Sequence, residues 1–170
     1  MPGIVEYVPI VGQSIIDDLR LLAEKLRNKV VQHINSTAVG GGVAEILNRM
    51  IPLLRELGVD ARWDLIKGGE QFFGVTKKFH NVLQGGPEEI TQRDFQIFLE
   101  TSEENIREVN VHGDIIFIHD PQPIALIRRK DLNKWIWRCH IDVSKPDQRV
   151  WKFLRHYIVR YDTEARREWP

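Results

Sequence analysis

The chain has 170 residues, a length that suits one domain with its own hydrophobic core. Its 24 basic and 24 acidic side chains balance, which argues against nucleic acid or a membrane surface as a partner and favours a small, locally recognised ligand. The single cysteine excludes an internal disulfide, and neither a leader segment nor an 18-residue apolar run is present, so we expect a cytoplasmic location.

The first part of the chain is expected to alternate helices and strands. Residues 13–28 repeat apolar side chains at helical spacing, and residues 29–37 form a strand pattern rich in valine and isoleucine. A second amphipathic helix is expected over residues 43–57, before Gly58, which suits a left-handed helix cap. Alternation of apolar and polar residues then predicts a strand over residues 59–66.

The remaining part continues this alternation after a pair of helices in series. Helical patterns over residues 70–83 and 91–109 are separated by a glycine-proline turn. The continuous apolar run at residues 114–119 predicts a central strand of a parallel sheet. The last expected elements are a short helix over residues 123–129, a strand over residues 134–141 and a helix over residues 146–157.

The order of these elements predicts an α/β fold with a Rossmann-like, mostly parallel sheet and helices on both faces, because strands separated by helices need crossover connections. In such sheets, ligands bind beyond the carboxyl ends of the strands. Three expected strand ends are unusually polar, and parallel strands would bring them to one rim, where they would suit a polyol. These ends are Asn35-Ser36-Thr37, His119-Asp120-Pro121-Gln122 and His140-Ile141-Asp142-Val143-Ser144.

A glycine loop, Gly40 to Gly42, lies between the first expected strand and the helix after it. Without Cβ atoms, its backbone N–H groups can approach a phosphate or a sugar hydroxyl at the positive end of that helix. The spacing matches neither the dinucleotide fingerprint nor the lysine-containing phosphate loop, so a simple flexible turn is the alternative. An independent nicotinamide-binding protein is therefore disfavoured.

Each polar strand end also has a structural interpretation. His119 could be a hydrogen-bonded core histidine, and Asp142 with Ser144 could cap the following helix. The other histidines lack the spacing of metal ligands, so we predict no metal and no cofactor. The histidines for which only structural roles are expected are His33, His80, His112 and His156.

Three segments in this order, HINSTAVGGGVAEIL, FIHDPQPIAL and WRCHIDVSKP, resemble the amino-terminal domain of retaining GT-B glycosyltransferases of the archaeal trehalose synthase type. Trehalose phosphorylases are similar relatives. The resemblance spans residues 5–161 and implies the amino-terminal half of a GT-B fold. It implies transfer of glucose from a nucleoside diphosphate glucose to free glucose, giving trehalose with the anomeric configuration retained. In that family this domain holds the acceptor sugar, and a second domain holds the nucleotide.

The resemblance also implies roles for individual residues. Gly41 and Gly42 would present backbone N–H groups to the donor diphosphate. His140 and Asp142 would be catalytic, close to the reacting centre, where they would orient the acceptor and stabilise an oxocarbenium-like transition state. The substrate-binding residues that the resemblance implies are Gly40, Gly41, Gly42, His119, Asp120 and Gln122.

The chain is shorter than the two-domain members of that family. We therefore expect an acceptor-binding domain over residues 1–162, a charged divergent tail over residues 163–170, and little or no transferase activity without a donor-binding domain. Glucose or trehalose would be the ligand, nucleoside diphosphate glucose would bind only with a second domain, and the uncovered face would favour a homodimer. The alternative is a non-catalytic sugar-binding or interaction module with the same fold.

Overall fold

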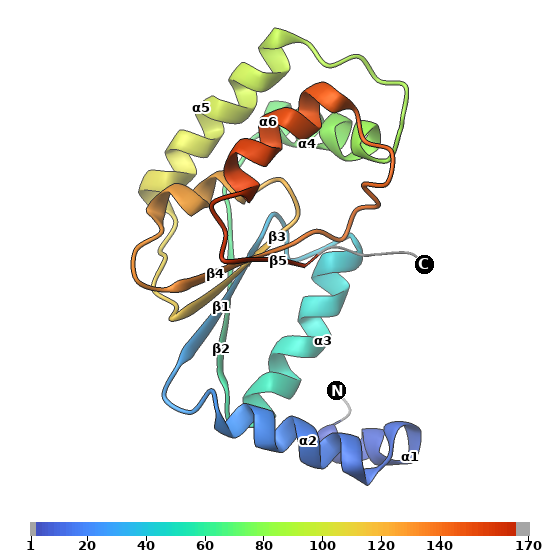
Figure 1. Ribbon diagram of the computed structural model, residues 1–170, viewed down its shortest axis with the longest axis vertical. Coiled ribbons are helices and arrows are strands. Elements are labelled where there is room, and N and C mark those ends of the chain that lie inside the picture. Colours follow the sequence, from blue (N-terminus) through green and yellow to red (C-terminus); the bar gives the residue numbers. More distant parts are fainter. Residues whose placement is uncertain (1–2, 166–170) are drawn as a thin grey trace.

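The computed structural model describes residues 3–165, and within this range the fold is built on a five-stranded parallel sheet (Figure 1). The strand order is β2-β1-β3-β4-β5. All four neighbouring pairs are parallel, so the predicted α/β class with a mostly parallel sheet is confirmed. The strands are β1 (Val30–Asn35), β2 (Asp60–Leu65), β3 (Ile115–His119), β4 (Lys134–Arg138) and β5 (Thr163–Ala165).

Helices cover both faces of the sheet, as the alternating pattern predicts. Helices α2 and α3 pack on one face, and α4, α5, α6 and η2 pack on the other (Figure 1). The short helices η1 and α1 at the start of the chain were not predicted. The helices are η1 (Ile4–Tyr7), α1 (Val8–Val11), α2 (Gln13–Glu24), α3 (Gly42–Glu56), α4 (Glu70–Leu83), α5 (Gln92–Glu108), η2 (Ile124–Arg129) and α6 (Gln148–Ile158). No helix of the described range is both long and apolar enough to cross a membrane.

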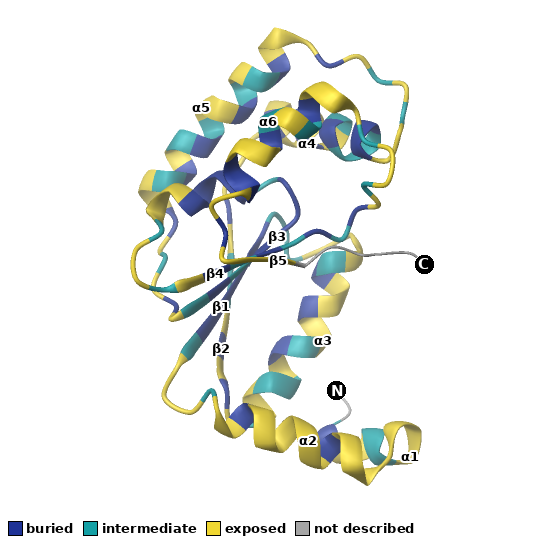
Figure 2. Ribbon diagram, viewed as in Figure 1, coloured by how far each residue is buried: buried dark blue, intermediate teal, exposed yellow. Residues whose placement is uncertain are grey.

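The sheet separates two hydrophobic cores, which appear as the dark interior of Figure 2. The larger core, on the α4–α6 side, includes the fully buried Trp135, Trp137, Phe72, Phe79 and Phe98. The smaller core, on the α3 side, includes Val31, Leu47, Ile51 and Ala61. Since neighbouring residues of a strand face opposite sides, Trp135 and Trp137 place Arg138 on the α3 side. Alternate residues of a strand face the same side, so Val31 in the smaller core places His33 on the α3 side.

Several element boundaries differ from the predictions by one to four residues; the largest difference is in α2, which ends at Glu24 and not at residue 28. Two of the differences have clear local reasons. Strand β4 ends at Arg138 rather than at residue 141, because the backbone N–H of His140 donates to the Asp120 side chain, 2.6 Å away, instead of to a neighbouring strand. Helix α6 begins at Gln148 rather than at residue 146, because the Asp147 carboxylate accepts from two backbone N–H groups of the first turn and acts as the N-cap.

The predicted domain over residues 1–162 and charged divergent tail over residues 163–170 stay predictions, although the first three residues of that tail belong to the sheet. Thr163–Ala165 form β5, which pairs in parallel with β4 at the edge of the sheet. An edge strand needs backbone partners on one side only and tolerates polar side chains, so the missing apolar pattern did not prevent pairing. The preceding Asp162 fixes the position of the chain before β5, since its carboxylate accepts from the backbone N–H of Trp135 at 2.8 Å and from the Lys130 ammonium at 2.7 Å. Residues 166–170 lie outside the described residues.

Candidate functional site

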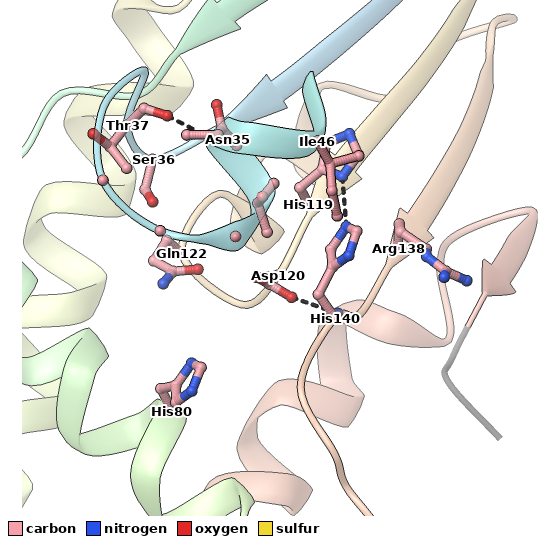
Figure 3. Close-up of a pocket in the computed structure, with 15 residues that line it drawn as sticks. Asn35, Ser36, Thr37, Ile46, His80, His119, Asp120, Gln122, Arg138 and His140 are labelled. Carbon is pink, nitrogen blue, oxygen red and sulfur yellow. Dashed lines mark hydrogen bonds between the residues drawn. The ribbon is translucent and has the colours of Figure 1, made fainter. Parts of the chain in front are cut away.

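A cavity of about 550 Å³ opens at the carboxyl ends of β1, β3 and β4 (Figure 3). The chain leaves β1 toward β2 on one side and leaves β3 toward β4 on the other, so the two crossovers diverge at this point of the sheet. Such a switch point is where open α/β sheets bind their ligands, and the volume suits a small molecule. The cavity is lined by Asn35, Ser36, Thr37, Gly40, Gly41, Gly42, Val43, Ala44, Ile46, His80, His119, Asp120, Gln122, Arg138 and His140.

The glycine loop forms one wall of the cavity and leads directly into α3. Gly40 and Gly41 have φ of +72° and +103°, a conformation that side-chain-bearing residues rarely adopt, while Gly42 is the first residue of the helix. No side chain caps this helix. The first backbone N–H groups of α3 have no partner within the helix, so they are available to a hydroxyl or an anion in the cavity.

Hydrogen bonds inside the loop hold the glycines in place. The Asn35 side chain accepts from the Trp63 indole at 2.7 Å and donates to the Thr37 carbonyl at 2.8 Å. The Thr37 hydroxyl donates to the carbonyl of Val39, and Asn48 of α3 donates to the carbonyl of Ala38. The polar residues that follow β1 therefore shape the loop rather than leaving it as a flexible turn.

Replacing Gly41 with alanine is expected to lower the free energy of unfolding by about 1–3 kcal/mol, the usual cost of holding a residue with a Cβ in a glycine-only backbone region. Gly42→Ala is the matched control. Gly42 lacks a positive φ, begins a helix and has open space around it, so alanine there should be neutral or slightly stabilising. Urea denaturation of both variants checks the pair, and equal losses would contradict the conformational argument.

Asp120 forms the corner between β3 and the cavity. Its φ is +62°, its backbone N–H donates to the Arg138 carbonyl, and its own carbonyl accepts from the Trp137 indole at 3.0 Å. Its carboxylate accepts from the His140 backbone N–H at 2.6 Å. Burial raises the pKa of this carboxyl to about 6. Asp120 therefore locks the ends of β3 and β4 together as well as lining the cavity.

Gln122 lines the cavity and has an unpaired polar atom. Its side-chain oxygen is buried and has no hydrogen-bond partner among the described residues. Buried polar atoms are nearly always paired in folded proteins, so the Gln122 side chain is a candidate to bind a ligand group. An amide offers both a donor and an acceptor, which matches a sugar hydroxyl in either orientation of the amide.

Three histidines cross the carboxyl ends of the strands in a row. His33 Nδ1 lies 3.0 Å from His119 Nε2. His119 Nδ1 lies 3.0 Å from His140 Nε2 (Figure 3). The His33 ring stacks on Phe117, with the ring centres 4.9 Å apart. Burial lowers the pKa of His33 to about 4, of His119 to about 3 and of His140 to about 4, with the neighbouring rings adding to the shift of His119. All three rings are therefore neutral at pH 7.

The structure brings together nearly all the residues that the sequence singled out. The same cavity is lined by the three loop glycines and by His119, Asp120, Gln122 and His140. Asp142 is not among the lining residues, and its carboxylate accepts from the backbone N–H of Ser144 at 2.9 Å in a local turn. Its predicted catalytic role stays a prediction.

Two lining residues, Arg138 and His80, were missed by the sequence analysis. Arg138 is the last residue of β4, and the strand-end rule selects it once β4 is ended at residue 138 instead of residue 141. His80 reaches the cavity from α4, and burial lowers its pKa. Helical periodicity places His80 on a face of α4 but does not specify where that helix crosses the sheet.

The fold and the cavity define an α/β domain of the glycosyltransferase type, with polar strand ends and a glycine loop around a switch-point cavity. The chain belongs to the family described as "Trehalose synthase, N-terminal domain", whose model matches residues 33–166. This match confirms the resemblance that the three sequence segments indicate. It also covers every residue of the histidine row and of the glycine loop.

Relatives of known activity extend the comparison. The chain is 44% identical over 160 residues to trehalose synthase of Thermococcus litoralis, covering 92% of this chain and 39% of that protein. It is 42% identical over 171 residues to trehalose synthase of Rubrobacter xylanophilus, with coverage of 96% and 41%. Trehalose phosphorylase of Pleurotus pulmonarius is 32% identical over 182 residues, with coverage of 92% and 25%. The chain thus spans about two-fifths of the length of the trehalose synthases that it matches.

Proposed function

We propose that residues 1–170 form the acceptor side of a retaining glucosyltransferase that makes trehalose from a nucleoside diphosphate glucose and glucose. The observation that supports this most strongly is the convergence of three polar strand ends and the glycine loop on one cavity, in a chain of the trehalose synthase family. Glucose, or trehalose as product, is the proposed ligand of this cavity. The proposed compartment is the cytoplasm, where nucleotide sugars are available.

The wall residues suit a sugar in a defined way. The Gln122 amide and the His140 ring offer hydrogen bonds to hydroxyl groups, and the first N–H groups of α3 offer further donors on the opposite wall. The same N–H groups, with the positive helix end behind them, would meet the diphosphate of a donor bound across the cavity. The role proposed for His140 is contact with the reacting sugar, and that for Asp120 is to hold His140 in place.

Transfer also needs groups outside these residues. Holding donor and acceptor in the reacting geometry can supply as much as about 7–11 kcal/mol of the barrier reduction, and a site with one wall cannot hold both. We therefore propose that the 170 residues bind the acceptor, that nucleoside diphosphate glucose binds only together with a second domain, and that trehalose forms only when that domain is present.

A reconstitution experiment tests this proposal. The chain is mixed with nucleoside diphosphate glucose and glucose, with and without the separately produced carboxyl-terminal part of the Thermococcus litoralis relative. We expect trehalose only when both parts are present, and we expect glucose alone to bind the 170-residue chain in a calorimetric titration. Trehalose formation by the chain alone would contradict the proposed need for a second domain.

Two variants connect the reconstituted reaction to the cavity. Gln122→Ala removes a neutral hydrogen bond worth about 1 kcal/mol, so glucose affinity should fall about fivefold. His156→Gln is the control, because His156 is exposed on α6 and is not among the residues that line the cavity. Equal glucose affinity for the wild type and Gln122→Ala would contradict the proposal that glucose binds in this cavity.

A non-catalytic sugar-binding or interaction module is the second candidate function. It is favoured by glucose binding that is retained while no trehalose forms in any mixture. Self-association belongs to either candidate, because the apolar Val39 and Ile46 are 83% and 48% exposed beside the glycine loop. Sedimentation velocity at high concentration should show a dimer, and a strict monomer would contradict that part.

A further inference from the structure

The row of His33, His119 and His140 has two possible hydrogen-bond directions. Each contact joins a ring nitrogen that donates to one that accepts, and a neutral imidazole has one of each. In the first direction every ring is protonated on Nδ1, so His33 donates to His119, His119 donates to His140, and His140 keeps an Nδ1–H. In the second direction every ring is protonated on Nε2, and each bond runs the other way.

The buried end of the row distinguishes these directions. His33 is 3% exposed, and its Nε2 has no hydrogen-bond partner among the described residues. In the second direction this nitrogen would carry a buried N–H without a protein acceptor, which is among the rarest arrangements in folded proteins. In the first direction the same atom presents only a lone pair, so the cost is smaller.

A metal ion does not explain the row. Zinc needs each ring nitrogen at about 2.0–2.1 Å, with the nitrogens arranged around it. Here the nitrogens face one another in pairs at 3.0 Å, which is a hydrogen-bond distance. Among the described residues, no group of three or more His, Cys, Asp or Glu side chains has the arrangement of a metal site.

We propose that His33 and His119 are positioning residues that fix His140 in the Nδ1–H form, so that His140 acts in the cavity as a hydrogen-bond donor and not as a base. The direction of the bonds follows from the geometry alone, and its consequence for a sugar rests on the proposed function. His140 is the only ring of the row that is not fully buried, and it lines the cavity together with His119. It would therefore donate to a sugar oxygen.

The surroundings keep the row neutral. The other charged or titratable groups that line this cavity are Arg138 from β4, Asp120 after β3 and His80 from α4. The positive charge of Arg138 lowers the pKa of His119 and His140 further, although burial is the larger cause. The α3 side contributes the apolar Val43 and Ile46 to the cavity wall. In the first direction, a proton added to His119 or His140 would set two N–H groups against each other at a contact, and one added to His33 would leave a buried N–H without a partner among the described residues.

Long-range proton–nitrogen NMR spectra of the ¹⁵N-labelled chain at pH 7 test the proposal directly, because protonated and bare ring nitrogens have well-separated shifts. We expect all three rings to be neutral with the proton on Nδ1. A His140 ring that is protonated on Nε2, or on both nitrogens, would overturn the proposal. The wild-type spectrum alone decides, so the result does not depend on the folding of a variant.

A pair of variants adds the positioning role. His119→Phe keeps a ring beside His140 but removes the donor to His140 Nε2, so the half-buried His140 should become a mixture of the Nδ1–H and Nε2–H forms. His156→Gln, on the exposed face of α6, should leave the His140 ring unchanged. A His140 ring that stays entirely in the Nδ1–H form in folded His119→Phe would contradict the positioning role. Glucose titration of the wild type separates the two proposals. If the rings are in the Nδ1–H form but their signals do not change when glucose is added, the proposed sugar binding is contradicted and the proposed bond direction is not.

Discussion

Acidification from pH 7 to pH 4 is expected to lower the free energy of unfolding by several kcal/mol. Burial lowers the pKa of His33 from 6.5 to about 4, and each pKa unit corresponds to about 1.4 kcal/mol, so this residue alone accounts for roughly 3 kcal/mol. His119 and His140 shift in the same direction. Urea denaturation at a series of pH values measures the effect.

The sign follows from proton binding. Between pH 6.5 and pH 4 the unfolded chain binds protons at these histidines and the folded chain does not, so stability is complete above pH 6.5 and is lost as the pH falls toward 4. Asp120 opposes this trend, because burial raises its pKa from 3.8 to about 6 and the folded state then binds the extra proton in the overlapping window. On acidification the three histidines together lower the free energy of unfolding by more than Asp120 raises it.

A variant separates the histidine row from general acid effects. In His33→Phe one of the three shifted groups is gone, so the loss of stability between pH 7 and pH 4 should be smaller than in the wild type. His156→Gln should keep the full wild-type loss. Stability that stays constant or rises on acidification would show that the rings accept protons readily in the folded state.

Replacing Asp120 with alanine is expected to lower the free energy of unfolding at pH 7 by about 2–5 kcal/mol relative to the asparagine variant, which is equally uncharged. The change leaves the partly buried His140 backbone N–H without its acceptor at 2.6 Å, which costs about 1–3 kcal/mol. It also places a residue without a polar side chain at a φ of +62°, which costs about 1–2 kcal/mol more. Glucose affinity should fall as well, because His140 loses its anchor.

Asparagine at the same position is the matched control. Its side-chain oxygen accepts the same hydrogen bond, it tolerates the left-handed conformation, and it carries no charge to bury. Asp120→Asn should therefore retain wild-type stability at pH 7 or exceed it, and it should remove the opposing contribution of the carboxyl between pH 4 and pH 6. Comparable losses in the alanine and asparagine variants would contradict the role assigned to the Asp120 oxygen.

Local sequence patterns were sufficient for the class of fold and for most of the site. Helix α4 has the predicted bounds of residues 70–83, and the five-residue strand β3 lies within the predicted range of 114–119. The patterns failed in two situations. In one, a side chain from a distant part of the chain ends a strand; in the other, a strand forms through backbone pairing alone. Asp120 ends β4 early, and β5 pairs through its backbone with little apolar signal.

The sequence by itself determined the alternation of helices and strands, the two-residue and helical periods that fix each buried face, and the strand-end positions of the glycine loop, His119, Gln122 and His140. Only the tertiary structure decided that His33, 86 positions before His119, begins a hydrogen-bonded row, and that Arg138 and His80 reach the same cavity. The physical reason is that periodicity is a local property. Strand order, register and helix crossing are set by packing between segments far apart in the chain, and those decide which side chains meet.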